Sequence, residues 1–427
     1  MPSQSQIVLS AVQSIMWAPL AGTVRNTAET RAGHPFQRCL HQERIMDIRE
    51  VETAVVYKDE SQACNQGSII QLADGDMLMA FNQERGRVHA DSGQSCLIRS
   101  TDGGRSWDRA GMQVVWPFTD HGGNWDCALS QRADGTLLMH TRVCSFIAPT
   151  ALHRIDLQGL GTGGERLKRQ TGYALFRSAD VGRTWEGPIP VNTFPIADSG
   201  NSAYMCGGSG AGHIVELPDG GLLMPLMGGI HRDGYTGSRG LTVGEMMRCF
   251  VLRSDDGGDN WEYWSTIAYD PAHIRAFQEP SVVRLASGRL ICMMRVTVRP
   301  ERFDNMWVAH SDDDGITWSP PHRTALWGYP PDVLQLQDGR VLAVYGYRAE
   351  PMGVRGCVSE NGLDWDLAAE FTICGCVGGP PEDPVYWHTG YPSVAQCPDG
   401  TLVAAYHEYS TDDEPIQYMR TTRFQLT

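Results

Sequence analysis

The sequence predicts an all-β fold, a six-bladed β-propeller of four-stranded blades whose ring is closed by an N-terminal strand. Three observations predict it. The 427 residues include 47 glycines, 24 prolines and 12 tryptophans, a composition typical of chains with many short strands and turns. A hairpin pattern occurs six times along the chain. A second pattern, acidic and rich in glycine, follows each of the first five hairpins.

The hairpin pattern consists of two runs rich in Val, Ile and Leu, joined by an Asp-Gly or Ser-Gly turn. Its first copy reads "QGSIIQLADGDMLMAF". The six copies span 66–81, 126–141, 211–226, 279–294, 330–345 and 391–406. Because the runs are apolar on both faces, we expect sheets that are covered on both sides.

The second pattern is Ser-x-Asp-x-Gly-x-x-Trp, and it follows a further strand-like run. Four complete copies carry the acidic residues Asp102, Asp180, Asp256 and Asp313, and a shorter fifth copy carries Asn361. An Asp in this place accepts hydrogen bonds from turn amides, and Gly adopts a positive φ at little cost. The pattern lacks the alternating ligands and the terminal Glu of a calcium loop. We therefore expect a turn that holds the blade together, with the Trp packed between neighbouring blades.

Together the two patterns define six units of four strands. The last unit ends with a third strand at 418–426, and we expect 51–59 to supply its missing outer strand, which removes a free sheet edge. Residues 46–427 therefore form the predicted propeller. Residues 1–45 carry no clear period. They are interpreted as a poorly ordered or atypical extension, as an extra helix, or as a segment outside the natural start.

Composition limits the classes of partner. The formal net charge of −15 argues against nucleic acid and anionic membranes, and no stretch approaches the ~20 apolar residues of a membrane span. The 12 cysteines lack zinc-finger spacing, which favours reduced thiols and a cytoplasmic location, with secretion left open. The glycine-rich stretch 159–169 lacks a nucleotide-binding pattern, so no cofactor or metal is expected. The oligomeric state stays open.

The residues that open the six hairpins face one another around the central channel of such a fold. They are Gln66, Asp126, Ala211, Glu279, Pro330 and Tyr391. The set is asymmetric and contains two carboxylates and a phenol. Asymmetry at equivalent positions indicates a functional site, whereas the repeated Asp turns indicate scaffold.

The alternation of hairpins and Asp turns resembles the Asp-box, or bacterial neuraminidase repeat, proteins, whose best-known members are the sialidases. The resemblance covers about residues 51–427. It implies a six-bladed propeller and a carbohydrate partner, but the fold hosts several chemistries, so activity has to be argued from the site.

The resemblance also implies catalytic residues. Tyr391 in "GYPSVAQC" matches the nucleophile of the family, and Glu279 in "QEPSVVRL" matches its base. Sialic acid carries a carboxylate on the carbon under attack, so a neutral phenol avoids the repulsion that an anionic nucleophile would meet. Asp91, in the loop before the first Asp turn, matches the acid/base, and Asp126 is the alternative acid. Each of these side chains also has an ordinary structural interpretation, as a packed Tyr or a solvated carboxylate.

The family binds the substrate carboxylate with three arginines, because a planar guanidinium fork suits a carboxylate. Arg295 matches the second arginine, and Arg348 or Arg355 matches the third. The sequence departs from the family's pattern at the first arginine, because Asn65 occupies that position in "CNQGSII". Arg85 or Arg87, in the loop that follows, is the candidate to substitute for it. Gln66 is expected to contact substrate through its place in the register.

Three functional hypotheses follow from these residues. The first is a sialidase-like retaining exo-glycosidase that removes a terminal acidic sugar. The second is another carbohydrate-active propeller, either a uronate polysaccharide lyase or a non-sialic glycosidase, in which Tyr391 transfers a proton. The third is a non-catalytic glycan-binding propeller.

Overall fold

The structure is a computed structural model, and it describes only part of the chain. The described residues are 46–87, 89, 92–146, 161–163, 166–191, 206–207, 212–228, 247–272, 274–298, 302–375, 389–411 and 414–427. Arg44–Thr427 forms a compact unit separate from Met1–Glu43. The prediction for residues 1–45 falls outside the described residues, so the fold below is that of the unit Arg44–Thr427.

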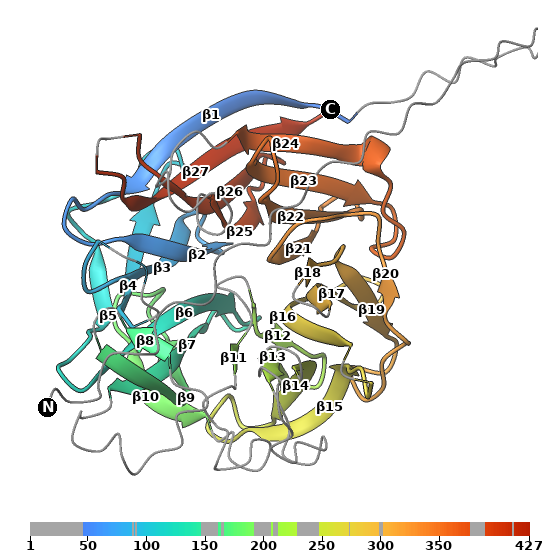
Figure 1. Ribbon diagram of the computed structural model, residues 1–427, viewed down its shortest axis with the longest axis horizontal. Coiled ribbons are helices and arrows are strands. Elements are labelled where there is room, and N and C mark those ends of the chain that lie inside the picture. The colour runs from blue at the N-terminus through green and yellow to red at the C-terminus, as the bar shows by residue number, and fades with distance from the viewer. Residues whose placement is uncertain are drawn as a thin grey trace, which may run out of the picture. The chain divides into compact units, whose positions relative to one another are not determined.

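Six antiparallel sheets follow one another in chain order around a common centre (Figure 1), as the repeats predict. The first contains β2 (Cys64–Gln71), β3 (Met77–Gln83), β4 (Gln94–Ser100) and β5 (Gln113–Trp116). The second contains β6 (Gly122–Gln131), β7 (Leu137–Phe146), β9 (Arg166–Ser178) and β10 (Glu186–Val191), with β8 (Gly161–Gly163) paired to β9. The third contains β13 (Leu222–Gly228), β14 (Arg248–Ser254) and β15 (Glu262–Ala268), with β11 (Cys206–Gly207) and β12 (Val215–Glu216) both paired to β13.

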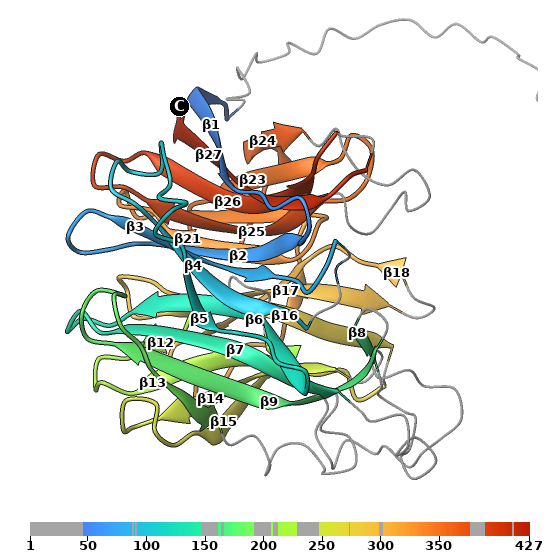
Figure 2. The same cartoon turned by 90° about the vertical axis from the view of Figure 1, so that its left-hand side faces the viewer.

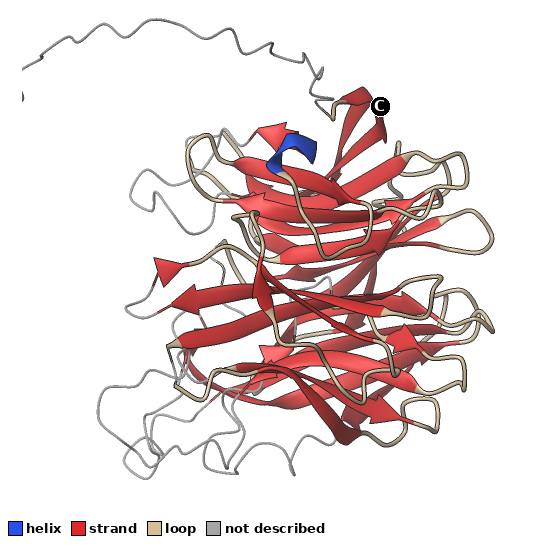
Figure 3. Ribbon diagram, turned by 90° about the vertical axis from the view of Figure 1, so that its right-hand side faces the viewer, coloured by secondary structure: helices blue, strands red, loops and turns tan. Residues whose placement is uncertain are grey.

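The remaining three sheets complete the ring. The fourth contains β16 (Arg275–Arg284), β17 (Leu290–Val298), β19 (Trp307–Ser311) and β20 (His322–Arg323), with β18 (Arg302–Phe303) paired to β17. The fifth contains β21 (Pro331–Gln335), β22 (Val341–Tyr347), β23 (Gly353–Ser359) and β24 (Glu370–Gly375). The sixth contains β25 (Thr389–Gln396), β26 (Leu402–Tyr409), β27 (Gln417–Leu426) and β1 (Ile48–Tyr57). The helical element of the described chain is the short 3-10 turn η4 (Leu367–Ala369), and no described helix has the length and apolar character to cross a membrane (Figure 3).

The ring closes as the sequence predicts. β1 pairs with β27 in antiparallel register, with Thr53 opposite Thr422 and Ala54 opposite Thr421. Figure 2 shows β1 running along the outer side of the sixth sheet. The first and last described strands thus share one sheet, and the edge of β27 is covered.

The core lies between neighbouring sheets. All seven residues of β3 are buried, as are all seven of β13. The cluster between the fifth and sixth sheets joins Leu342 and Val344 of β22 to Ala404 and Tyr406 of β26, each fully buried. Strands that are apolar on both faces are therefore packed on both faces, as expected.

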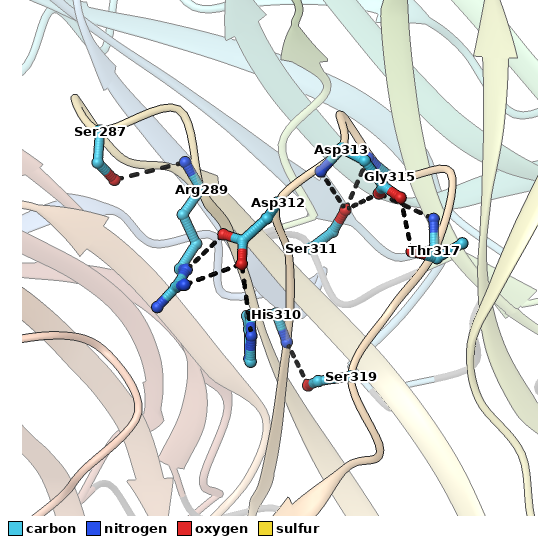
Figure 4. A network of polar contacts seen from close by, with 9 residues as sticks. All are labelled: Ser287, Arg289, His310, Ser311, Asp312, Asp313, Gly315, Thr317 and Ser319. Atoms are coloured by element: carbon cyan, nitrogen blue, oxygen red, sulfur yellow. Dashed lines mark hydrogen bonds and ion pairs between the residues drawn. The ribbon is translucent and has the colours of Figure 1, made fainter.

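The Asp turns are structural, and Figure 4 shows the copy at Asp313. Ser311 Oγ donates to Asp313 Oδ1 at 2.7 Å, and Thr317 donates to the same carboxylate through its backbone N at 2.9 Å and its hydroxyl at 2.6 Å. Gly315 has φ +81°, and a Cβ there would lie 3.0 Å from Leu223 of the third sheet. The same bonds occur at Asp102, Asp180 and Asp256. Within the described residues, no group of three His, Cys, Asp or Glu side chains has the geometry to hold a metal ion.

Two tryptophans of these turns bond to the neighbouring sheet, in line with the prediction of packing between blades. Trp318 Nε1, in the fourth sheet's turn, donates to Ser265 Oγ of β15 at 3.1 Å. Trp107 Nε1, in the first sheet's turn, donates to Thr421 Oγ1 of β27 at 3.4 Å. These two turns therefore close their own blades and also join them to the preceding ones.

A belt of hydrogen bonds joins the innermost strands. In each, a side-chain oxygen of one sheet accepts a bond from a backbone N of the next. The pairs are Ser68 with Leu129, Ser130 with Ile214, Ser281 with Val333, Asp332 with Val394 and Ser393 with Ile69, at 2.7–3.1 Å. These bonds prevent the inner strands of neighbouring sheets from sliding along one another. The same strands carry the candidate site.

Candidate active site

Four residues that open the hairpins share an unusual backbone conformation. Gln66, Asp126, Glu279 and Tyr391 have φ of 54°, 55°, 47° and 50°. Each lies where its strand pairing shifts register, as a β-bulge does. Non-glycine residues adopt this region at a cost of roughly 1–3 kcal/mol, and residues in such conformations cluster at functional sites. Pro330 immediately precedes β21, and Ala211 lies outside the described residues.

Tyr391 and Glu279 meet at the centre of the ring. Tyr391 Oη, on β25, donates to Glu279 Oε1, on β16, at 3.1 Å. Arg295 Nη1, on β17, donates to the same oxygen at 2.8 Å. Tyr391 and Glu279 are both nearly enclosed, with exposed fractions of 9% and 4%. Burial, and then the Glu279 carboxylate, raise the pKa of Tyr391 well above its ordinary value, so the phenol is protonated at rest.

Arg348 joins this group from the end of β22. Its guanidinium lies 4.9 Å from the ring centroid of Tyr329 and 5.6 Å from that of Tyr391. Arg295 also lies over the ring of Tyr329, at 4.4 Å from the same centroid. Burial lowers the pKa of Arg348, although the guanidinium stays charged at neutral pH. Two largely enclosed guanidiniums therefore contact one aromatic ring beside the phenol.

Tyr329 was not singled out from the sequence. The signal that points to it is the triplet Gly-Tyr-Pro, which occurs at 328–330 and again at 390–392. The first copy immediately precedes the inner strand β21, and the second lies at the start of the inner strand β25. Tyr391 is the first residue of its hairpin copy, whereas Tyr329 comes one residue before the start of its own copy. A comparison of the residues that open the hairpins therefore selects Pro330 and not Tyr329.

Asp126 and Gln66 line the side of the site nearest the first two sheets. Asp126 Oδ2 lies 2.5 Å from Arg142 Nη2, and its charge contributes to the raised pKa of Tyr391. Gln66 Oε1 accepts a bond from Asp126 N at 3.3 Å, and Gln66 N donates to His407 Nδ1 at 3.4 Å. The His407 ring stacks on Tyr391 at 5.8 Å between centroids. Arg142 and His407 are the further polar residues that sequence reasoning missed.

The two candidates for the third arginine lie in different surroundings. Arg355 does not join the group, because its Nη1 pairs with Glu370 Oε2 at 2.9 Å and its guanidinium stacks on Tyr347. Arg348 is the arginine that lies beside Tyr391.

The two arginines of the first loop have backbone carbonyls among their described partners. Arg85 donates to the carbonyls of Thr119 and Gly122 and lies over the rings of Phe118 and Phe146. Arg87 donates to the carbonyls of Glu60 and Glu414. Arg87 also lies 3.8 Å from the Glu414 carboxylate. The predicted acid Asp91 lies outside the described residues, so its position stays a prediction.

Comparison with known proteins agrees with this architecture. The model of the BNR repeat-like domain matches residues 125–404. The chain belongs to this family. It falls within the sialidase-like superfamily of BNR propellers, as the Asp turns indicate.

Relatives of this BNR propeller share its fold at low identity. A sialidase of Bacteroides fragilis is 24% identical over 250 residues, which make up 57% of this chain and 40% of that protein, so the chain spans well under half of its relative's length. A Dyadobacter fermentans protein of unknown function is 22% identical, with a TM-score of 0.70 over 89% of this chain and 99% of the other. The NanB sialidase of Streptococcus pneumoniae is 14% identical, with a TM-score of 0.59 over 87% and 71%. A Penicillium chrysogenum α-L-arabinanase is 14% identical, with a TM-score of 0.55 over 88% and 98%.

The BNR propeller departs from the expected arginine arrangement at Asn65, which is fully buried at the start of β2. Asn65 Nδ2 lies 3.3 Å from Glu84 Oε1, 2.8 Å from His89 Nδ1 and 3.3 Å from Gln417 Oε1. One of these partners is a carboxylate, and none is a guanidinium. The two guanidiniums described beside Tyr391 therefore come from the fourth and fifth sheets.

Proposed function

We propose that the protein is a retaining glycoside hydrolase that uses Tyr391 as nucleophile and Glu279 as its base. The observation that carries the proposal is the 3.1 Å hydrogen bond from Tyr391 Oη to Glu279 Oε1, with Arg295 on the same oxygen. A phenol with a raised pKa is a poor nucleophile alone, and a carboxylate in hydrogen-bond contact can take its proton as attack proceeds.

In the first step, the Tyr391 oxygen forms a bond to the anomeric carbon while its proton passes to Glu279. The bond from that carbon to the leaving oxygen breaks, and the leaving oxygen takes a proton from a general acid. We assign that acid to Asp91, from the loop between β3 and β4, with Asp126 as the alternative. In the second step, water gives a proton to the acid residue and its oxygen displaces the phenolate, which regains its proton from Glu279.

The substrate we propose is a terminal acidic sugar of the sialic acid type. Arg295 and Arg348 are largely enclosed cations next to the nucleophile, and two guanidiniums suit a carboxylate on or beside the anomeric carbon. An acidic group there also explains why the nucleophile is a phenol. A carboxylate nucleophile would be repelled by the negative charge of the substrate, whereas a neutral phenol is not. The named activity of the Bacteroides fragilis relative supports the same substrate class.

The test is hydrolysis of 4-methylumbelliferyl sialoside and 3′-sialyllactose by the full chain. Wild type should release free sialic acid, and Tyr391→Phe should lower kcat/KM at least about 10³-fold. Tyr406→Phe is the matched control, because Tyr406 is also buried in the sixth sheet and bonds to Thr422 outside the site. A folded wild-type protein that releases no sialic acid contradicts this substrate.

Asn65 favours a second candidate, a carbohydrate-active propeller for a different sugar. Its amide cannot supply the charge of a third guanidinium. A panel of aryl glycosides and uronate polymers separates the outcomes. Release of a neutral sugar indicates a non-sialic glycosidase, and an unsaturated ultraviolet-absorbing product indicates a lyase with Tyr391 as proton donor. Binding without turnover indicates a glycan-binding protein.

A further inference from the structure

A group of polar side chains, three of them buried and the fourth partly buried, lies in and just after β3 and at the start of β2, outside the mechanism above. It contains Asn65, Asn82, Glu84 and His89, which we call the blade-1 polar group. Asn65 and Asn82 are directly opposite each other on β2 and β3, so their side chains share one face. Glu84 follows Asn82 by two residues, and its Oε1 lies 3.1 Å from His89 Nδ1.

This group is connected to the nucleophile through two residues, Gln66 and His407. Asn65 precedes Gln66, whose backbone N donates to His407 Nδ1. The His407 ring stacks on Tyr391. Burial, then Arg348 and then His89, lower the pKa of His407 well below its ordinary value, so Arg348 and His89 both act electrostatically on this ring. His407 therefore connects the blade-1 polar group to the catalytic phenol.

Part of the hydrogen-bonding capacity of this group is not used within the described residues. Asn82 is fully buried, and neither its Nδ2 nor its Oδ1 has a hydrogen-bond partner there. Asn65 Oδ1, also fully buried, has none either. Buried amides without partners are costly, and native proteins rarely keep them without a reason. Two amides that face the same side, with a donor and two acceptors to spare, are arranged to receive a polar ligand.

The charge of this group selects the kind of ligand. Glu84 has no exposed surface, and the polar contacts of Asn65 include no guanidinium. A carboxylate bound at Asn65 would bring a second negative charge beside the Glu84 carboxylate, which already pairs with His89, and the described contacts of Asn65 include no guanidinium to offset that charge. A hydroxyl group can accept from an amide Nδ2 and donate to an amide Oδ1, and it brings no charge.

We propose that the blade-1 polar group is a subsite for a hydroxyl group of the sugar, and that the sugar's carboxylate is held by Arg295 and Arg348. The proposal rests on the proposed function for the identity of the ligand as an acidic sugar. It adds an orientation: the anionic edge of the ring faces the fourth and fifth sheets, and a hydroxyl-bearing edge faces the first. Asn82 is then a specificity-determining residue.

The test measures folding and binding separately in the full chain. Asn82→Leu keeps the size and removes the unpaired amide, so the free energy of unfolding should stay equal to wild type or rise. Asn124→Leu is the matched control, because Asn124 is also buried but accepts from Ser95 and donates to Trp116, and its loss should destabilise. Asn82→Ala serves as a second variant if the leucine is not accommodated. Destabilisation by Asn82→Leu and Asn82→Ala as large as that by Asn124→Leu would assign Asn82 a structural role and overturn the proposal.

Binding is measured by calorimetry with two acidic sugars that need no turnover, 2-deoxy-2,3-didehydro-N-acetylneuraminic acid and D-glucuronate. We expect at least one to bind wild type, and the folded Asn82 variant to weaken that binding about tenfold or more, since a site built for a hydroxyl loses strongly when a polar partner is removed. Equal affinity of wild type and variant, or no binding of either probe, overturns the subsite. Binding that is sensitive to Asn82 without any sugar release contradicts the hydrolase but leaves the subsite intact.

Discussion

Tyr391 and Glu279 lie 112 residues apart in the chain and on different sheets, yet a 3.1 Å hydrogen bond joins the phenol to the carboxylate. Both residues have left-handed backbone conformations at equivalent bulges. The bulges turn the two side chains into the same buried space, where Arg295 bonds to the carboxylate as well. Because of this contact, we expect removal of either residue to abolish the same catalytic step.

The first prediction concerns this pair. Glu279→Gln should lower kcat/KM about 10²–10⁴-fold, because the amide keeps the shape but cannot take the phenol proton. Combined with Tyr391→Phe, it should cost little more than Tyr391→Phe alone, since the two residues act in one step. Glu370→Gln is the control, because Glu370 pairs with Arg355 outside the site. Losses that multiply in the double variant would contradict a shared step.

The second prediction concerns the packing of Arg348 against Gly390. A Cβ at residue 390 would lie 2.6 Å from Arg348 Nη2, and the residue has φ +156°. Gly390→Ala should displace the guanidinium and raise KM for an acidic substrate about tenfold. Gly400→Ala, in the turn of the same hairpin, also has a positive φ and nothing within 4 Å of its Cβ, so it should leave KM unchanged. Steady-state kinetics of both variants check the prediction, and an equal KM in the two contradicts it.

The third prediction concerns acid stability. Hydrogen bonds from Thr184 lower the pKa of Asp180 to about 2, and those from Asn260 lower the pKa of Asp256 to about 2. A carboxylate with a folded pKa below its ordinary value stabilises the fold fully above about pH 4, and this contribution is lost as the pH falls toward about 2. Wild type should therefore lose thermal stability steeply over that range.

Changing both Asp180 and Asp256 to Asn should flatten this loss, because an amide has no proton to gain. The melting temperatures of wild type and the double variant, followed between about pH 2 and 6, check the prediction. An unchanged slope would exclude these two turns as a source of acid sensitivity.

The fourth prediction concerns the pair between His213 and Asp332. His213 Nε2 lies 3.7 Å from Asp332 Oδ2, and its Nδ1 lies 2.6 Å from the carbonyl of Leu129. Burial, the largest effect, disfavours the charged imidazole, but the Asp332 carboxylate and the Leu129 carbonyl together outweigh it and raise the pKa of His213. A raised pKa stabilises the fold fully below the ordinary value of 6.5, and the contribution is lost as the pH rises through the folded value.

Denaturant unfolding at about pH 6 and about pH 9 checks this prediction. The difference in free energy of unfolding between wild type and His213→Gln should be larger at the lower pH. His322→Gln provides the control, because His322 is exposed on β20. A difference that is the same at both values would show that the pair does not titrate with folding.

Much of the fold follows from local sequence. Hairpin runs and Asp turns encode strands and tight turns, and their repetition sets the number and order of the blades. The closing strand was predictable because the last unit lacked an outer strand and the chain before the first hairpin had strand character. Register then placed Glu279 and Tyr391 around one channel, where the structure joins them by a hydrogen bond.

The rest of the site was not predictable in the same way. Arg348 and Arg355 are equally plausible in the sequence, but one lies beside Tyr391 and the other pairs with Glu370. A long side chain reaches several places from one backbone position, and its partner is chosen by neighbouring strands. Tyr329 escaped notice for a related reason, since its role depends on two arginines from different strands.

The sequence by itself determined the repeated blades, the structural role of the Asp turns and the ring of asymmetric residues that contains Tyr391. Alternating apolar runs and turn residues act over a few positions, so they can be read along the chain. Only the tertiary structure decided that the guanidiniums of Arg295 and Arg348 lie beside the phenol. It also decided that Asn65, Asn82 and Glu84 are buried together in the first blade. Burial and the pairing of charges arise when distant strands pack, and no local pattern records them.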